Sequence, residues 1–363
     1  MPVYKDDKTG TWFCKFRYKD WTDTTKNKMK RGFKTRREAV QWENDFKLRI
    51  AGDLEMLFVD FVAVYKKERF PRLKKDTRVM KENIIDQKIV PYFKNKKLNE
   101  ITPTDVIEWQ NTLLQEINPK TGKGYSKSYL KTIHNQLSAI LNYAVRYYKL
   151  SRNPAAIAGN IGDESEIKIH YWTLEQYQRF SEEMMLDPVA YYAFQVLYWL
   201  GLREGEMMAL TPADFDFVKK TVRVNKTYVV VKGEHMVTSP KTQKSNRIVQ
   251  MPDRLCEEMQ EYMAKIPNLK KTDRIFSTVT KSFLYRRIKD GARKAGLPEI
   301  RVHDLRHSHV SLLIQMGFSA VAIAERMGHE SISVTYHYAH MFPSVQADMA
   351  DHLNALMEVK KNV

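Results

Sequence analysis

Hydrophobic and polar residues alternate along TWFCKFRYK, a stretch near the start of the chain. One face carries Trp12, Cys14, Phe16 and Tyr18, and the other carries Phe13, Lys15, Arg17 and Lys19. A period of two residues is typical of a β-strand with one buried face. The segment KMKRGFK is a candidate partner strand, and Thr35 with Glu38 forms a capping box that predicts a helix to about Ile50. We expect residues 1–52 to form a small three-stranded sheet with one helix.

A helical period of about 3.6 residues marks the next part of the chain. It recurs in four segments, residues 54–70, 76–93, 102–117 and 126–150. Thr102 and Pro103 supply an N-cap and a proline at the first helical position of the third segment. We therefore expect a compact helical domain over residues 55–152. Turn-forming and polar residues dominate 153–170, which predicts a linker.

After this linker the pattern becomes mixed. A capping box at Thr173 and Gln176 predicts a helix start, and the apolar run 188–200 predicts a helix that ends at Gly201. Three strand candidates follow at residues 221–231, 236–240 and 245–252. Helical periodicity then returns almost to the end of the chain. The sequence thus predicts a multidomain protein, mainly α with small β-sheets, whose last domain, residues 171–363, is mixed α+β.

Charge narrows the choice of partner. The net charge of +17 favours a polyanion, and nucleic acid is the commonest one. Residues 1–50 hold 14 Lys and Arg against 7 Asp and Glu, so the basic sheet face is a candidate DNA surface, and the alternative is a solvated face. The residues expected to contact DNA are Lys15, Arg17, Lys19, Lys28, Lys30 and Arg31. Two cysteines exclude a disulfide framework, and the polar start without a long apolar run predicts a cytoplasmic protein.

Four places carry side chains suited to chemistry. They are Arg203 with Glu206 in GLREGE, Lys241 in a turn between strands, His303 with Arg306 in HDLRH, and His329 followed by Tyr336 and Tyr338. Each place alone is also compatible with an ordinary structural role. Together they suit phosphoryl transfer, because two arginines clamp phosphate oxygens, a lysine protonates a leaving oxygen, and a tyrosine is a nucleophile. Arginine charge takes the place of a metal in such a site.

The ordered set Arg203, Lys241, His303, Arg306, His329 and Tyr338 resembles the pattern of the tyrosine site-specific recombinases, specifically of phage- or transposon-type integrases. MGH stands here where that family usually has LGH. The resemblance covers the whole chain. It implies an arm-site-binding domain at residues 1–52, a core-site-binding domain at 55–152 and a catalytic domain at 171–363.

The resemblance also implies roles. Tyr338 attacks the scissile phosphate and becomes linked to the DNA 3′-phosphate, Lys241 protonates the 5′-oxygen, and Arg203 and Arg306 bind the non-bridging oxygens. The remaining assignments are that His303 is the general base for Tyr338 or positions the phosphate, that His329 donates to a phosphate oxygen, and that Glu206 orients Arg203. No cofactor, metal or ATP is implied. The implied partners are core-type and arm-type attachment sites on double-stranded DNA, three further copies of the chain, an excisionase and a DNA-bending host protein.

Two tyrosines compete for the nucleophile role. Residues two apart on a helix point about 200° apart, so both side chains cannot face one site. Ile332, Tyr336 and Ala339 share a stripe, which predicts that Tyr336 lies in the core, while Val334, Tyr338 and Met341 form a weaker stripe. The spacing of nine residues after His329 selects Tyr338 by resemblance to the family.

A tail helix is expected over residues 344–359. Ser344 is a candidate N-cap, and Val345, Met349, Leu353 and Leu356 form an apolar stripe. The residues leave open whether this stripe packs on the chain's own catalytic domain. In related recombinases this segment docks on a neighbouring copy.

Two functions of other classes remain as alternatives. In a metallohydrolase, His303 and His307 would share a metal, but Asp304 replaces the glutamate of the HExxH motif and Arg306 would repel the cation. A non-catalytic DNA-binding regulator would explain the charge and the basic domains, but not the ordered set of reactive residues.

Overall fold

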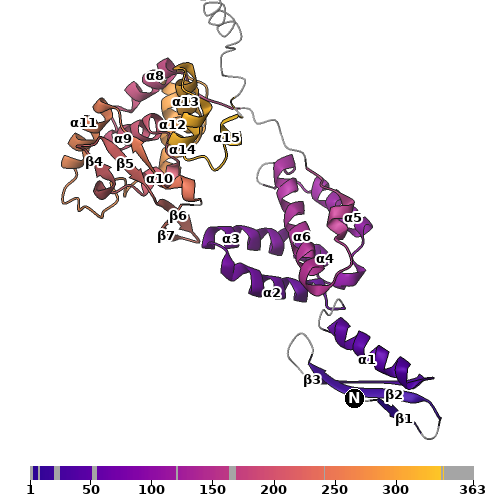
Figure 1. Ribbon diagram of the computed structural model, residues 1–363. Helices are drawn as coiled ribbons and strands as arrows, with labels where there is room; N and C mark the ends of the chain where they lie inside the picture. Colours follow the sequence, from indigo (N-terminus) through magenta and orange to yellow (C-terminus); the bar gives the residue numbers. More distant parts are fainter. Residues whose placement is uncertain are drawn as a thin grey trace, which may run out of the picture. The chain divides into compact units, whose positions relative to one another are not determined.

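The computed structural model describes residues 3–6, 9–19, 25–50, 55–119, 122–162, 169–240, 242–336 and 338. The chain divides into two compact units, Met1–Glu166 and Ile167–Val363 (Figure 1). Among the described helices, none combines the length and the apolar character that crossing a membrane requires.

The first unit begins with the expected sheet. Strands β1 (Val3–Lys5), β2 (Trp12–Lys19) and β3 (Thr25–Phe33) pair antiparallel in that order, and α1 (Arg36–Ile50) lies against them (Figure 1). The alternation along β2 is confirmed, since Cys14 and Phe16 are buried while Lys15 and Arg17 are exposed. A bulge shifts the register of β2 against β3, where Gly32 has a φ of 87°.

The start of α1 uses the predicted cap in a slightly extended form. The Glu38 N–H donates to the Thr35 hydroxyl at 3.2 Å, and the Glu38 carboxylate accepts from the Lys34 N–H at 3.0 Å. On the sheet side, Trp42 contacts the rings of Phe16 and Phe33. Aromatic packing therefore fixes α1 on the apolar face of the sheet and leaves the basic face open.

Helices make up the rest of the first unit. They are α2 (Phe58–Arg69), η1 (Phe70–Arg72), α3 (Lys75–Ile84), η2 (Ile85–Ile89), α4 (Val90–Phe93), η3 (Leu98–Glu100), α5 (Pro103–Gln115) and α6 (Lys127–Tyr148). The run from α3 to α4 is continuous, and its middle turn is a π-turn. Pro91 lacks an N–H for the ordinary helical bond, and a wider turn just before it accommodates this loss. Phe61, Phe93, Trp109 and Leu137 lie at the centre of the core.

The predicted linker 153–170 is wrong in its first half. Residues Pro154–Ala158 form helix α7, and Ala155 is fully buried in the helical core. The Asn153 side chain caps this helix by accepting from the Ala155 N–H at 2.9 Å, and it donates to Asn142 of α6 at 2.9 Å. An Asn-Pro pair is both a turn signal and a helix start, and the buried contacts with α6 decide between the two.

The second unit combines helices with two small sheets. Its helices are α8 (Leu174–Met184), α9 (Pro188–Trp199), α10 (Glu204–Met208), η4 (Pro212–Asp214), η5 (Gln243–Ser245), α11 (Asp253–Ala264), α12 (Lys281–Lys294), α13 (Asp304–Gln315), α14 (Ala320–Met327) and α15 (Ser333–Tyr336). Strands β4 (Phe215–Asp216), β5 (Thr221–Val224) and β8 (Arg247–Gln250) form one sheet, and β6 (Thr227–Val231) pairs with β7 (Glu234–Thr238). The predicted fold class is confirmed.

The single strand expected at 221–231 is wrong, because β5 and β6 belong to different sheets. Asn225 and Lys226 separate the end of β5 from the start of β6. The Lys226 ammonium reaches the buried Asp214 carboxylate at 2.6 Å, so this residue leaves the strand to satisfy a buried charge. The strand expected at 236–240 occurs as β7, two residues earlier.

Helix α9 passes through the middle of the second unit and contacts α8, α11 and α13 (Figure 1). Its second half is the more deeply buried part, with Ala193, Phe194, Val196, Leu197 and Tyr198 in the core. Trp172 closes the core from the start of the unit, where its backbone N–H donates to Ser308 of α13 at 2.9 Å. The end of α9 is joined to α13 by the hydrogen bond from Arg306 to the Gly201 carbonyl. The tail helix expected at 344–359 lies outside the described residues.

Candidate active site

Arg306 is a buried cation of the second unit, held by two backbone carbonyls. It lies on α13, is only 4% exposed, and donates through Nη1 to the Gly201 carbonyl at 2.7 Å and through Nη2 to the Met327 carbonyl at 2.6 Å. Gly201 has a φ of 60°, and a Cβ there would lie 2.7 Å from the His309 ring. Glycine is thus required for α9 to end close enough to receive Arg306.

Glu206 stands between two arginines. Its Oε1 accepts from Arg203 Nη1 at 2.7 Å, and its Oε2 accepts from the Arg203 backbone N–H at 3.0 Å. From the other side, Arg247 Nη2 donates to Oε2 at 3.0 Å. Burial alone would raise the pKa of Glu206, but the charges of Arg247, Arg203 and Arg306 outweigh it and lower the pKa to about 2. The carboxylate is therefore ionised at any working pH, and it contacts Arg203 as the sequence led us to expect.

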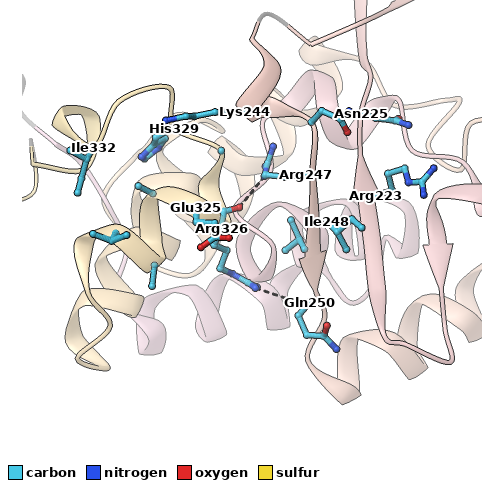
Figure 2. Close-up of a pocket in the computed structure, with 16 residues that line it drawn as sticks. Arg223, Asn225, Lys244, Arg247, Ile248, Gln250, Glu325, Arg326, His329 and Ile332 are labelled. Atoms are coloured by element: carbon cyan, nitrogen blue, oxygen red, sulfur yellow. Dashed lines mark hydrogen bonds between the residues drawn. The ribbon is translucent and has the colours of Figure 1, made fainter.

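Arg247 is a site residue that the sequence reasoning missed. Figure 2 shows it on β8, among the residues that line an open cleft between this strand and α14. The cleft has a volume of about 1140 Å³. The Nε of Arg247 donates to the Arg326 carbonyl at 2.9 Å, so it joins β8 to α14 as well as to Glu206. A signal was present in the alternation of β8, where Arg247 and Val249 are buried while Ile248 and Gln250 are exposed. An arginine at an inward strand position needs a buried carboxylate nearby.

His329 follows α14, which ends at Gly328 in a left-handed conformation. The ring is buried, and its Nδ1 lies 2.8 Å from the Thr335 hydroxyl of α15. Burial, together with the charges of Arg306, Arg203 and Arg247, lowers the pKa of His329 to about 3. A neutral ring whose Nδ1 accepts from Thr335 carries its proton on Nε2, so His329 can donate one hydrogen bond to a phosphate oxygen.

The two candidate tyrosines differ in burial. Tyr338 is 4% exposed and packs with Val310, Ile314 and Met327, whereas Tyr336 is 55% exposed. The prediction that Tyr336 lies in the core is therefore wrong. Helix α15 is a single turn, and the Tyr338 N–H donates to the Thr335 carbonyl at 3.0 Å, so a helical stripe does not extend to this residue. Burial raises the pKa of Tyr338 to about 12, against the smaller opposite effect of Arg306.

The Tyr338 hydroxyl is hydrogen-bonded to Nδ1 of His307. Sequence reasoning had offered His303 for this place and had considered His307 only as a metal ligand. His303 is exposed on one side, and its ring lies edge-on to that of His307 at 5.3 Å. Desolvation on its inner side, with the charges of His307, Arg306 and Arg203, lowers the pKa of His303 to about 4.

The sequence matches known families in all three parts. Residues 172–344 match the phage integrase family, residues 57–114 match the SAM-like N-terminal domain of phage integrases, and residues 2–50 match an arm DNA-binding domain. The ICEBs1 integrase of Bacillus subtilis (strain 168) is 30% identical over 288 residues, which cover 76% of this chain and 76% of that protein. The chain belongs to the phage integrase family. The resemblance to tyrosine recombinases is thereby confirmed, and the chain is an enzyme of this class.

Further relatives of this family support the assignment. The integrase of Mycobacterium phage L5 is 26% identical and aligns with 72% of this chain and 70% of that protein. The Tn1549 transposon integrase in complex with transposon right end DNA matches with a TM-score of 0.67 at 19% identity, over 84% of this chain and 100% of that chain. A lambda integrase dimer bound to a COC′ core site matches with a TM-score of 0.58 at 16% identity, over 93% of this chain and 94% of that chain. These structures show the shared fold, and the metallohydrolase and regulator alternatives are left without support.

Of the other expected site residues, Lys241 lies outside the described residues. Lys244 of η5 donates to the Glu330 carbonyl at 3.0 Å, which places η5 beside the residues that follow His329. The basic face of the sheet is exposed at Lys15, Arg17 and Arg31. Lys28 and Lys30 are also exposed, but they pair with Phe16 and Cys14 and so lie on the opposite face, the one that α1 covers. Lys19 belongs to β2, but its side chain is outside the described part of the structure. DNA contact by these residues remains a prediction.

Proposed function

We propose that the chain is a site-specific DNA recombinase that integrates and excises a mobile element by cutting and rejoining DNA through a 3′-phosphotyrosine. The observation that carries the proposal is that Arg306 donates to the carbonyls of Gly201 and Met327, which stand two residues before Arg203 and His329, while the Tyr338 hydroxyl contacts His307 of α13, the helix that carries Arg306. The proposal is also supported by Met327, because Arg306 donates to its carbonyl at 2.6 Å and Tyr338 belongs to the same buried cluster as Met327.

In the cleavage step, Tyr338 Oη forms a bond to the scissile phosphorus and the bond from phosphorus to the 5′-oxygen breaks. Lys241 supplies the proton that this oxygen takes as it leaves. Arg203 and Arg306 bind the non-bridging oxygens, whose charge grows in the transition state. His329 donates to one of these oxygens, and the exposed His303 positions the phosphate. Glu206 holds Arg203 in place throughout.

In the rejoining step, the 5′-hydroxyl of a partner strand attacks the phosphotyrosine and releases Tyr338. The phosphodiester energy is kept in the protein–DNA bond, so no nucleotide cofactor is consumed. Exchange between two duplexes requires two cleavages on each, which implies four copies of the chain on the DNA. A lambda integrase tetramer bound to a Holliday junction has the same fold, with a TM-score of 0.58 over 92% of this chain.

The partners of the chain are two classes of double-stranded DNA site. The helical domain and the catalytic domain bind core-type sites, and the basic sheet of the first unit binds arm-type sites, as the match of residues 2–50 to an arm DNA-binding domain supports. An excisionase and a DNA-bending host protein complete the proposed assembly, since two site classes on one duplex must be brought together by bending.

A nicked suicide substrate carrying the core site tests this proposal. Cleavage releases a short fragment that cannot be rejoined, so the covalent complex accumulates. The wild type should give this complex in excess EDTA, with the protein on the 3′ side and a free 5′-hydroxyl that polynucleotide kinase can label. A covalent 5′ linkage, or cleavage without any covalent complex, would contradict the proposed function.

A further inference from the structure

Three side chains at the start of α13 have different surroundings. His303 precedes the helix and is exposed, Arg306 turns inward to two backbone carbonyls, and His307 lies against Tyr338. The His307 and Tyr338 rings are 5.6 Å apart between centroids and inclined by 48°. The partner of the nucleophile is thus a residue outside the set of six that the sequence singled out.

The Asp304 carboxylate faces Nε2 of the His307 ring. Nε2 of the ring lies 3.9 Å from Asp304 Oδ1, and Asp304 is only 1% exposed. Asp304 is itself fixed, because its Oδ2 accepts from the Arg301 backbone N–H at 2.8 Å and its Oδ1 accepts from Arg301 Nη2 at 2.9 Å. A carboxylate facing Nε2 favours the tautomer with the proton on Nε2. Nδ1 is then the acceptor, and the Tyr338 hydroxyl donates to it.

The arrangement is a hydroxyl, an imidazole and an orienting carboxylate in series. This is the general order by which proteins activate a hydroxyl nucleophile, with a base in hydrogen-bond contact and a third group that sets the tautomer of the base. His303 has the exposed position, which suits contact with the DNA phosphate. His307 is half-buried on the side of the nucleophile.

We propose that His307 is a catalytic residue that accepts the proton of Tyr338 during DNA cleavage, an inference that rests on the proposed recombinase function. As the bond from Oη to phosphorus forms, the hydroxyl proton moves to Nδ1, and the bond from phosphorus to the 5′-oxygen breaks. When a 5′-hydroxyl attacks the phosphotyrosine, the imidazolium returns this proton to Oη. Asp304 orients the ring and stabilises its transient charge.

The protonation states of the free protein agree with this role. Burial lowers the pKa of His307, with Arg301 and Arg306 acting in the same direction and Asp304 in the opposite one. The groups that face the ring are therefore Asp304, Arg301, Arg306, His303 and the tyrosine hydroxyl itself. His307 is neutral near pH 7 and able to take a proton, while Tyr338 still holds its own.

The variant His307→Gln separates proton transfer from hydrogen bonding. A glutamine oxygen can still accept from the tyrosine hydroxyl, but it cannot take the proton. Single-turnover cleavage of the nicked core site should fall by about 10²–10⁴-fold, with unchanged DNA affinity. Tyr336→Phe is the matched control and should cleave at the wild-type rate. Cleavage by His307→Gln within about threefold of wild type would mean that the contact only holds Tyr338 in place, and the proposal would fail.

A substrate with a sulfur atom at the bridging 5′ position distinguishes the two proton transfers. A thiolate leaves without protonation, so it should rescue Lys241→Ala but leave His307→Gln slow. Rescue of His307→Gln would place His307 on the leaving group and overturn the proposal. Failure of the wild type to form any covalent complex would instead count against the recombinase function itself.

The pH dependence of the wild type gives a readout that needs no variant. Cleavage should increase with pH through one group titrating below the ordinary histidine pKa of about 6.5 and then level off, because His307 must be neutral to accept the proton. A rate that continues to rise tenfold per pH unit up to about pH 9 would mean that Tyr338 loses its proton directly to hydroxide. That result would contradict a role for His307 even if the glutamine variant did not fold.

Discussion

Positive charge is used in two different ways in the two units of the molecule. In the second unit, Arg306 and Arg247 are 4% and 9% exposed, and each has fixed partners at hydrogen-bond distance. On the sheet of the first unit, Lys28, Lys30 and Arg31 are exposed to solvent. Buried charges require specific partners and act over short distances in a low dielectric, whereas exposed charges are screened by salt. The first arrangement suits chemistry on one phosphate, and the second suits attraction to many.

The partners of the two sets differ accordingly. Glu206 is shared by Arg203 and Arg247, so the carboxylate fixes two guanidinium groups with one another. Arg31 in the sheet lies 3.8 Å from Asp6, and Lys30 lies over the rings of Phe33 and Trp42. Exposed ion pairs and exposed cation–π contacts each contribute little to stability. We therefore expect single substitutions to be severe in the catalytic unit and mild in the sheet.

The largest effect is expected at Arg306. Arg306→Ala should reduce cleavage of a saturating core-site substrate by about 10³-fold or more, because a preorganised donor to a charged transition state is lost. Arg306→Lys should restore little, since an ammonium cannot reach the Gly201 and Met327 carbonyls and a phosphate in the same fork. The exposed Arg293, paired with Asp290 at 3.3 Å, is the matched control, and Arg293→Ala should cleave normally. Full activity of Arg306→Lys would argue against a clamp.

The next effect concerns stability and its dependence on pH. Glu206 has a folded-state pKa of about 2 against an ordinary value of 4.5, so its charge stabilises the fold above the ordinary value and this contribution is lost as pH falls towards 2. Glu206→Gln should lower the free energy of unfolding by roughly 3 kcal/mol near neutral pH. Urea titrations at several pH values should show the difference from wild type narrowing below about pH 4. A difference independent of pH would mean that packing, not charge, is lost.

Substitution of Arg247 tests directly whether the charge of Glu206 stabilises the fold. Arg247→Met removes one of the two cations on Glu206, so it should raise the pKa of this carboxyl and move the acid loss of stability to higher pH. In the double variant Glu206→Gln, Arg247→Met, the cost should be less than the sum of the single costs, because no buried charge is left alone. Additive costs would show that the two side chains do not act as a pair.

The smallest effect is expected on the sheet. Replacing Lys15, Arg17 and Arg31 together by Gln should weaken arm-site binding and reduce the slope of log affinity against log salt by about three, one for each lost phosphate contact. Cleavage of a core-site substrate should not change. The control replaces the exposed Lys265, Lys270 and Lys271 of the second unit, which should leave arm-site affinity unaltered. An unchanged salt slope in the sheet variant would make the basic face a solvated surface only.

Elements set by local signals could be predicted from the sequence, and features set by long-range contacts could not. The alternation in β2, the capping boxes and the apolar run of α9 are local signals, and the corresponding elements formed as predicted. The six candidate catalytic residues followed from an ordered motif, and their roles remain predictions. Long-range contacts gave no such signal: α7 depends on Asn153 reaching α6, and β5 ends because Lys226 turns to Asp214. His307 depends on such a contact, since it is identified by the Tyr338 hydroxyl that it touches, whereas the inward position of Arg247 could be seen in the alternation of β8 but its partner Glu206 could not.

The central claim is that a buried tyrosine within reach of the arginine clamp is the nucleophile, and peptide mapping of the covalent adduct tests it most directly. The wild type would be trapped on the nicked core site, digested with protease and nuclease, and analysed by tandem mass spectrometry. The nucleotide should be found on Tyr338, and Tyr336→Phe should give the same adduct while Tyr338→Phe gives none. An adduct on the exposed Tyr336 would contradict the account, because the residue in contact with His307 would then not be the one that attacks DNA.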